Sequence, residues 1–118
     1  MTARLENEYG VINIEREVVA RIAGYAAIEC YGIVGMAAKN VKDGFVQLLK
    51  IESLTKGIKM QVNENKVSLD LHIIVEYGTN ISVIADNIIS TVRYSVEEYT
   101  GLEVEEVNIF VDGVRVDN

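Results

Sequence analysis

The stretch from Tyr9 to Met36 constrains the fold most, because its hydrophobic periodicity changes once and is then followed by two glycines. Residues 11–14 carry the apolar positions of a short strand. From Glu15 to Glu29 the apolar residues recur three and four apart, which predicts a helix with one buried stripe. That stripe includes Val18, Val19 and Ile22, and it then narrows to small residues, namely Ala23, Gly24, Ala26, Ala27 and Cys30. Small side chains let another backbone approach closely, so we expect this helix at the centre of the fold.

The elements after this stretch follow from local periodicity. A second, shorter helix is expected from Asp43 to Glu52, and two strands over 58–62 and 67–77, of which the second alternates most regularly. A long helix with an inward stripe that ends at Tyr99 is expected next, followed by a strand over 107–112. The order β-α-α-β-β-α-β predicts an α+β fold, in which a mainly antiparallel sheet of three to four strands carries helices packed on one face.

Length and composition point to one ordinary globular domain. A chain of 118 residues has room for one core, so we expect a single domain over 1–118, with a flexible lead at 1–8 and a tail at 113–118. No apolar run approaches the roughly 18–20 residues that cross a bilayer, and the N-terminus lacks the apolar core of a signal peptide. The single cysteine, Cys30, excludes an internal disulfide and is compatible with a reducing cytoplasm. These features predict a cytoplasmic protein.

The net charge of −7 conceals an uneven distribution of charge along the chain. All six lysines fall within 39–66, where they face three acidic residues, while five arginines and fifteen acidic residues occupy the rest. One interpretation is that these charges only form solvated surfaces, and the other is that they form a dipolar surface that orients a partner or a second copy. In the second interpretation, the lysine-bearing segment and the nearby apolar residues contact the partner. The candidates are Lys39, Lys42, Lys50, Phe45, Leu48 and Leu49.

The residue types needed for catalysis or metal binding do not occur in a recognisable pattern. His72 is the single histidine, and its position on the polar side of a strand near Asp70 and Glu76 indicates a solvated sheet face rather than a metal site. The sequence has no H-E-x-x-H, C-x-x-C or phosphate-loop motif. Cys30 lies on the apolar stripe, whereas a nucleophilic cysteine needs a partly exposed, electropositive setting. We therefore expect no catalytic, cofactor-binding or metal-binding residues, and no enzyme activity.

One spacing favours a different class of function. Gly32 and Gly35 enclose Ile33-Val34 between two expected helices, which is the order of a KH domain, whose G-x-x-G loop clamps a nucleic-acid backbone. Such loops carry basic residues because phosphate contacts dominate affinity, whereas the inner pair here is apolar. Lys39 and Lys42 are close in sequence and keep the alternative open, although the sequence pI of about 4.7 argues against nucleic acid.

Several runs together resemble a known family. They are G-x-I-x-I, the helix V-V-A-x-I-A-x-x-A-A-x-E, then Y-G-I-V-G-M, V-E-Y-G-T-N-I near Tyr77, and the closing V-N-I-F-V-D-G-V-R-V. This pattern resembles the alkaline-shock/Gls family of Gram-positive envelope stress proteins, and in particular its short YloU-like branch. The family usually places Ser, Thr or Asp where this chain has Glu15, a poor helix N-cap.

The resemblance implies a non-catalytic protein of envelope stress or cell-envelope homeostasis, with no catalytic residues to carry over. It implies an assembly or adaptor module whose partner is a second copy or a protein adaptor. A membrane-anchored partner is also left open, and it would hold the protein peripherally at the inner face of the membrane. The alternative class is the KH-like nucleic-acid-binding module that uses the Gly32–Gly35 loop and the nearby lysines.

Overall fold

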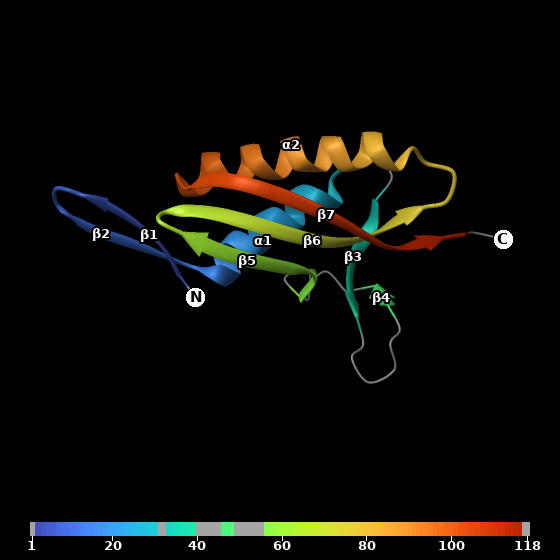
Figure 1. Cartoon of the computed structure of the whole chain (residues 1–118), viewed down its shortest axis with the longest axis horizontal. Coiled ribbons are helices and arrows are strands. Elements are labelled where there is room, and N and C mark those ends of the chain that lie inside the picture. The colour runs from blue at the N-terminus through green and yellow to red at the C-terminus, as the bar shows by residue number, and fades with distance from the viewer. Residues whose placement is uncertain (1, 31–32, 40–45, 49–55, 117–118) are drawn as a thin grey trace.

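The computed structural model describes residues 2–30, 33–39, 46–48 and 56–116 (Figure 1). It confirms the predicted α+β class. In chain order the elements are β1 (Thr2–Asn7), β2 (Gly10–Glu15), α1 (Arg16–Ile28), β3 (Ile33–Lys39), β4 (Val46–Leu48), β5 (Ile58–Asn63), β6 (Lys66–Glu76), α2 (Ile81–Thr100) and β7 (Glu103–Arg115).

Strand β6 organises the larger sheet. Along one edge it pairs with β7 in parallel, and α2 makes the crossover that a parallel connection requires. Along its other edge it pairs antiparallel with β5 over its first half and with β3 near its end, and β4 lies outside β3. Strands β1 and β2 form a separate two-stranded sheet. The larger sheet is therefore mainly antiparallel, as predicted.

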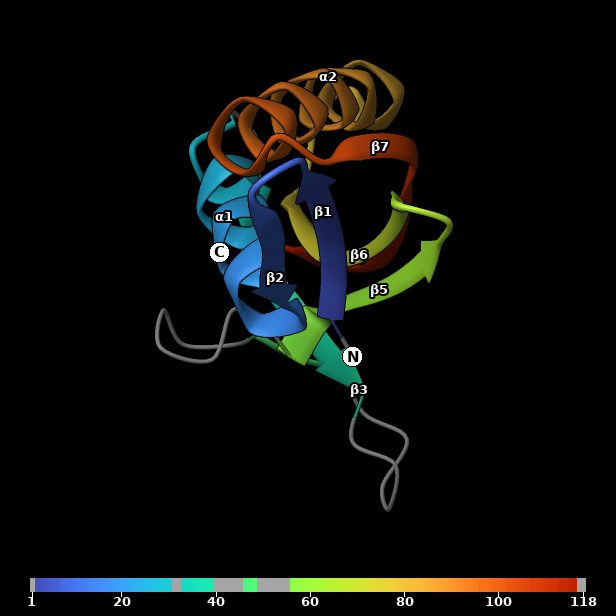
Figure 2. The ribbon, with the colours of Figure 1, turned by 90° about the vertical axis from the view of Figure 1, so that its left-hand side faces the viewer.

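The helices lie on one face of this sheet because β6 alternates strictly between buried and half-buried residues. Its buried side chains are Val67, Leu69, Leu71, Ile73 and Val75. Helices α1 and α2 lie together over that face (Figure 2). The small-residue stripe of α1 is buried, as predicted, with Ala23 and Ala27 fully inaccessible to solvent. The core is thus one layer of aliphatic side chains between two helices and a curved sheet.

The two chain ends contain more strand than the sequence predicted. Residues 1–8, expected as a flexible lead, contribute β1, which pairs with β2 over six residues. Ala3 is fully buried and Leu5 packs against the core, so the two apolar residues of β1 anchor the hairpin. At the other end β7 continues to Arg115, into the segment 113–118 that was expected as a tail.

The predicted helix from Asp43 to Glu52 is wrong where the structure describes it. Val46–Leu48 forms β4 instead, and residues 43–45 and 49–52 lie outside the described residues. Strand β4 pairs antiparallel with β3, which lies in the segment between the two expected helices. The apolar spacing of the segment favoured a helix, but pairing with a distant strand overrides such local preferences.

The helix ends follow the local sequence. The Asn80 side chain caps α2 by accepting a hydrogen bond from the Val83 amide at 3.2 Å, and Gly101 ends this helix with a φ of 77°. Glu15 occupies the N-cap of α1 without a side-chain capping bond, as its poor capping propensity predicted. Arg16 instead ties the start of α1 to the sheet, since its guanidinium donates to the carbonyl oxygen of Ile58 in β5.

A groove between the two helices as the candidate functional site

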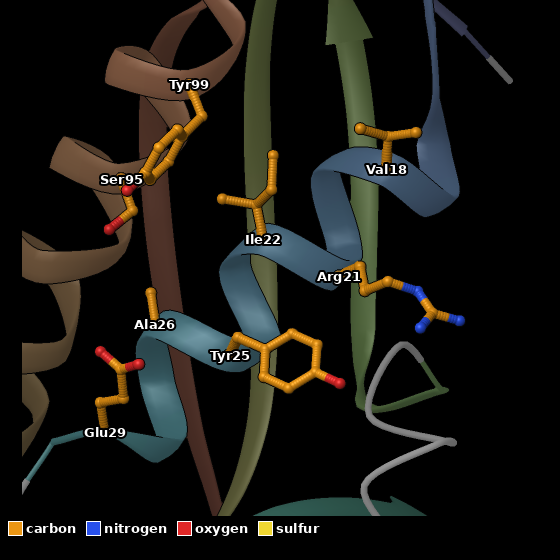
Figure 3. A pocket seen from close by; sticks show the side chains of 8 residues that line it. All are labelled: Val18, Arg21, Ile22, Tyr25, Ala26, Glu29, Ser95 and Tyr99. Atoms are coloured by element: carbon orange, nitrogen blue, oxygen red, sulfur yellow. The ribbon is translucent and has the colours of Figure 1, made fainter.

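A groove of about 540 Å³ lies between α1 and α2 on the side away from the sheet core (Figure 3). Helix α1 supplies most of its wall, and α2 supplies two residues near its C-terminal end. The lining residues are Val18, Arg21, Ile22, Tyr25, Ala26, Glu29, Ser95 and Tyr99. The groove exists because small residues let the two helices meet deep in the core while larger side chains stand outside.

Three lining residues are large, apolar and exposed. Val18 is 48% exposed, Tyr25 42% and Tyr99 77%, and half-buried Ile22 lies between them on α1. Val18, Ile22 and Tyr25 follow the i, i+4, i+7 spacing, so they form one stripe along α1. Single exposed apolar residues are common on proteins, but a concave cluster of them marks a surface suited to binding.

Two charged residues stand at different points along the groove. Arg21 lies near Val18 and pairs with Glu17 at 3.4 Å in an exposed i,i+4 ion pair. Glu29 lies at the other end of α1 (Figure 3). Arg21 and Glu29 are eight residues apart on one helix, so they mark different ends of the groove, and the charge of Arg21 is already paired with that of Glu17.

The groove lining combines apolar area with a few polar groups. Its described lining offers one carboxylate, one guanidinium, the Ser95 hydroxyl and two phenols, but no imidazole or thiol. A nucleophile needs an adjacent base within hydrogen-bonding distance, and none of the hydrogen bonds of the described residues supplies one here. What the groove offers a ligand is apolar area with a few polar contacts at its rim.

The open face of the sheet carries the single histidine in a defined arrangement. The His72 Nδ1 atom lies 2.7 Å from Asp112 Oδ2, and the ring stacks on Phe110 with centroids 4.8 Å apart. Asp70 accepts a hydrogen bond from the Asn108 amide at 3.0 Å. Within the described part of the chain, no group of three His, Cys, Asp or Glu side chains could hold a metal ion. The open face thus combines polar cross-strand contacts with the exposed ring of Phe110.

Of the predicted contact residues, the structure describes the backbone at Lys39, in β3, and at Leu48, in β4. These two strands pair, so the two positions lie near each other in one sheet. The other candidates, Lys42, Phe45, Leu49 and Lys50, lie outside the described residues. Their role in binding stays a prediction.

The charges are less separated in space than in sequence. Lys59 lies opposite Asp70 in the β5–β6 ladder, and Lys66 lies opposite Glu103 in the β6–β7 ladder. A lysine next to an acidic residue across a ladder contributes little to a dipolar surface. The remaining support for a basic patch therefore falls on the segment that contains Lys39.

The structure contradicts the helix–loop–helix setting on which the KH-like alternative depended. Ile33 and Gly35 belong to β3 and pair with Val75 and Ile74 of β6. Gly32 lies outside the described residues. A KH domain presents its G-x-x-G as a loop between two helices, whereas most of this motif is part of a sheet.

The sequence prediction missed the groove because it assigned its walls to the core. Val18 was placed on the buried stripe of the first helix and Tyr99 on the inward stripe of the last, yet both are exposed. One signal was available in the sequence. The apolar residues of α1, which include the adjacent Val18 and Val19, span an arc of the helix that is wider than one neighbouring element can cover.

Comparison with known proteins assigns the family. The model of the family of alkaline shock protein 23, described as having a cell envelope-related function, matches residues 4–116. The chain belongs to this family. The predicted alkaline-shock/Gls membership is thereby confirmed.

Relatives of this alkaline-shock family member include proteins of two Gram-positive genera. YloU of Bacillus subtilis (strain 168) is 46% identical over 119 residues, an alignment that covers 100% of this chain and 99% of YloU. A stress response regulator gls24 homologue of Streptococcus pyogenes serotype M3 is 31% identical, over 90% of this chain and 59% of that protein.

Among solved structures, a manganese form of the MamM CTD superposes with a TM-score of 0.51 at 15% identity. The match covers 84% of this chain and 99% of that one. At this identity, the likeness extends to the fold alone.

Proposed function

We propose that this protein is a non-catalytic adaptor of the cell-envelope stress response, and that it binds an amphipathic helix of a partner protein in the α1–α2 groove. The exposed apolar stripe Val18–Ile22–Tyr25, faced by Tyr99, carries the proposal. The cell envelope-related description of the family and the stress-regulator name of its gls24 relatives support the biological setting.

A helix is the partner element that fits such a groove best. Helices pack by placing the side chains of one into the spaces between side chains of the other, and a third helix can lie over the seam between two. The i, i+4, i+7 spacing of the α1 stripe matches the anchor spacing of helix-in-groove recognition. Glu29 favours one orientation, because a partner helix with a basic residue near this carboxylate would bind in one direction.

The position in the cell follows from the partner in this proposal. No helix in the described part of the chain is long and apolar enough to cross a membrane. We propose that the protein resides in the cytoplasm and is held at the inner face of the membrane when its partner is membrane-anchored. In this proposal the groove residues bind the partner, and the partner supplies the attachment to the membrane.

Site-specific photo-crosslinking in the native bacterium tests the proposal. A photoreactive phenylalanine replaces Tyr25 in the groove or, as the matched control, Tyr94, which is 67% exposed on α2 outside the groove lining. We expect a discrete adduct from position 25 that contains a helical segment of an envelope-associated protein, and no such adduct from position 94. Val18→Glu should abolish the adduct, because it places a charge among the apolar contacts. Equal labelling from both positions, or an adduct that survives Val18→Glu, would refute binding in the groove.

A further inference from the structure

We propose that β1 is a pairing edge through which two copies of this protein join their N-terminal hairpins into one four-stranded antiparallel sheet. The contact is isologous, with Arg4 of each copy opposite Glu6 of the other. It uses a different surface from the α1–α2 groove and goes beyond the adaptor function.

The hairpin is built as an isolated two-stranded sheet with an accessible outer edge. Its register runs without interruption from Thr2↔Glu15 to Asn7↔Gly10. It projects past the end of the helical layer, so a second hairpin can lie alongside it (Figure 1). Strand β2 leads directly into α1 and contacts it, whereas β1 pairs with no second strand among the described residues. Two-stranded hairpins are marginal alone, and further strands stabilise them.

The alternation of backbone groups in β1 determines which residues can pair outward. Asn7↔Gly10 closes the two-residue turn, which makes it a hydrogen-bonded pair. Hydrogen-bonded pairs then alternate along the ladder, so Leu5 and Ala3 direct their N–H and C=O groups toward β2. Arg4 and Glu6 direct theirs toward the open edge, where an incoming strand would find two unused donors and two unused acceptors.

The charges on this edge select one register. Arg4 and Glu6 lie on the same face of β1, joined by an ion pair of 3.0 Å, and their side chains are 58% and 65% exposed. Antiparallel pairing of two identical strands can place Arg4 opposite Arg4, Glu6 opposite Glu6, or Arg4 opposite Glu6. Like charges directly opposite each other destabilise a sheet and opposite charges stabilise it. The third register is therefore favoured, and it forms two Arg–Glu pairs that flank Leu5 opposite Leu5.

Two strands of the larger sheet with free edges in the described part of the chain, β7 and β5, are less suited to pairing. Strand β7 has two register shifts against β6 and carries Glu103, Glu105 and Glu106. Bulges and clustered like charges are devices that discourage edge pairing. Strand β5 carries an exposed lysine, Lys59, and part of its edge is used by the bond from Arg16 to Ile58. Among these described edges, β1 is the one whose charges can complement themselves.

Sedimentation equilibrium of the purified protein tests the pairing. We expect a monomer–dimer equilibrium, a dissociation constant raised about tenfold by Arg4→Glu, and recovery in Arg4→Glu/Glu6→Arg, because the swap restores opposite charges at both positions. Arg115→Glu makes the same charge change at the last residue of β7, a strand that ends on the opposite side of the molecule from the β1–β2 hairpin (Figure 1), and should leave the equilibrium unchanged. A monomer at every concentration, or a dimer in which the swap does not recover the loss, would overturn the proposal.

An engineered disulfide tests the register itself. Leu5 opposite Leu5 is a non-hydrogen-bonded pair with Cα atoms about 4.5 Å apart, within the range of about 4.4–6.8 Å that a disulfide spans. In a Cys30→Ala background, Leu5→Cys should oxidise to a covalent dimer, while Ile12→Cys on β2, an outer strand of the four-stranded sheet, should not. Crosslinking of both variants to the same extent would contradict the β1 register. If the protein dimerises but gives no photo-crosslinked adduct at position 25, only the adaptor function is overturned, and the pairing of β1 stands.

Discussion

Replacing Leu71 or His72 by alanine should lower the free energy of unfolding by different amounts, because the two residues lie on opposite faces of β6. Leu71 is fully buried and lies between Ile58 of β5 and Ile109 of β7. Removing a buried leucine side chain leaves a cavity and costs about 2–5 kcal/mol. Since domains of this size are stable by about 5–15 kcal/mol, Leu71→Ala should remove a large fraction of the total.

His72→Ala should cost less, because the residue lies on the half-buried open face. The change removes the 2.7 Å hydrogen bond to Asp112 and the stacking on Phe110. A net hydrogen bond and an aromatic pair together contribute about 1–2 kcal/mol. Leu71→Asp adds an unpaired buried charge at the neighbouring position and should prevent folding altogether.

Urea and thermal denaturation, both followed by circular dichroism, measure the two effects. At about 4 °C per kcal/mol, the midpoint of thermal unfolding should fall by about 8–20 °C for Leu71→Ala and by about 4–8 °C for His72→Ala. The dependence of unfolding free energy on urea should stay the same, which shows that the same surface is exposed on unfolding. Equal losses from the two substitutions would refute the assignment of the buried face.

Three further predictions concern the helix ends and the cysteine. Asn80→Ala should destabilise the protein by about 1 kcal/mol because it removes the capping bond of α2, whereas Glu15→Ala should cost almost nothing, and chemical denaturation distinguishes them. Gly101→Ala should cost about 1 kcal/mol because φ is 77°, while Gly10→Ala, at a position of ordinary φ with open space around it, should be nearly neutral in the same assay. Cys30 is 7% exposed, so thiol reagents should label it only as fast as the protein opens.

The elements that the sequence predicted correctly are those whose signal is local. Strand β6 alternates over its full length because one face meets the helices and the other does not. Helix α2 combines a cap, a long apolar stripe and a terminal glycine, and each is recognisable within a few residues. The β5–β6 hairpin follows from turn residues, and Glu64 and Asn65 adopt the positive φ that such turns require.

The elements that it missed depend on pairing with distant residues. Strand β3 shows no regular alternation over Ile33–Lys39, and its position is fixed by Val75, Ile74 and Ile73 of β6, far along the chain. Strand β1 offers only Ala3 and Leu5 as apolar residues, too few for a periodic signal. Neither segment carries enough local preference to identify a strand, because sheet stability comes from cross-strand contacts.

The candidate site could not be located from sequence for a related reason. Periodicity shows that Val18 and Tyr99 lie on apolar arcs of their helices, but it does not show where the neighbouring helix stops covering those arcs. The crossing of α1 and α2 leaves both residues exposed at the rim. The edge properties of β1 were equally hidden, since Arg4 and Glu6 acquire a role only once the strand exists.

The lysine-bearing segment and the β1 edge predict different kinds of assembly, which one set of measurements can separate. A basic segment that meets acidic surface on another copy is a heterologous contact, so it can continue into rings or filaments, and salt should screen it over about 8 Å at physiological ionic strength. Pairing at the β1 edge, in contrast, is complete once two copies have joined.

In sedimentation velocity, species larger than a dimer should therefore disappear in Lys39→Glu/Lys42→Glu/Lys50→Glu and at high salt, whereas the dimer should respond to reversal of Arg4 or Glu6. Large species that persist in the triple variant would remove the lysines from the interface. If instead that variant lost the dimer as well, the two surfaces would not be independent, because a change near β3 would then act on a hairpin that shares no strand with it.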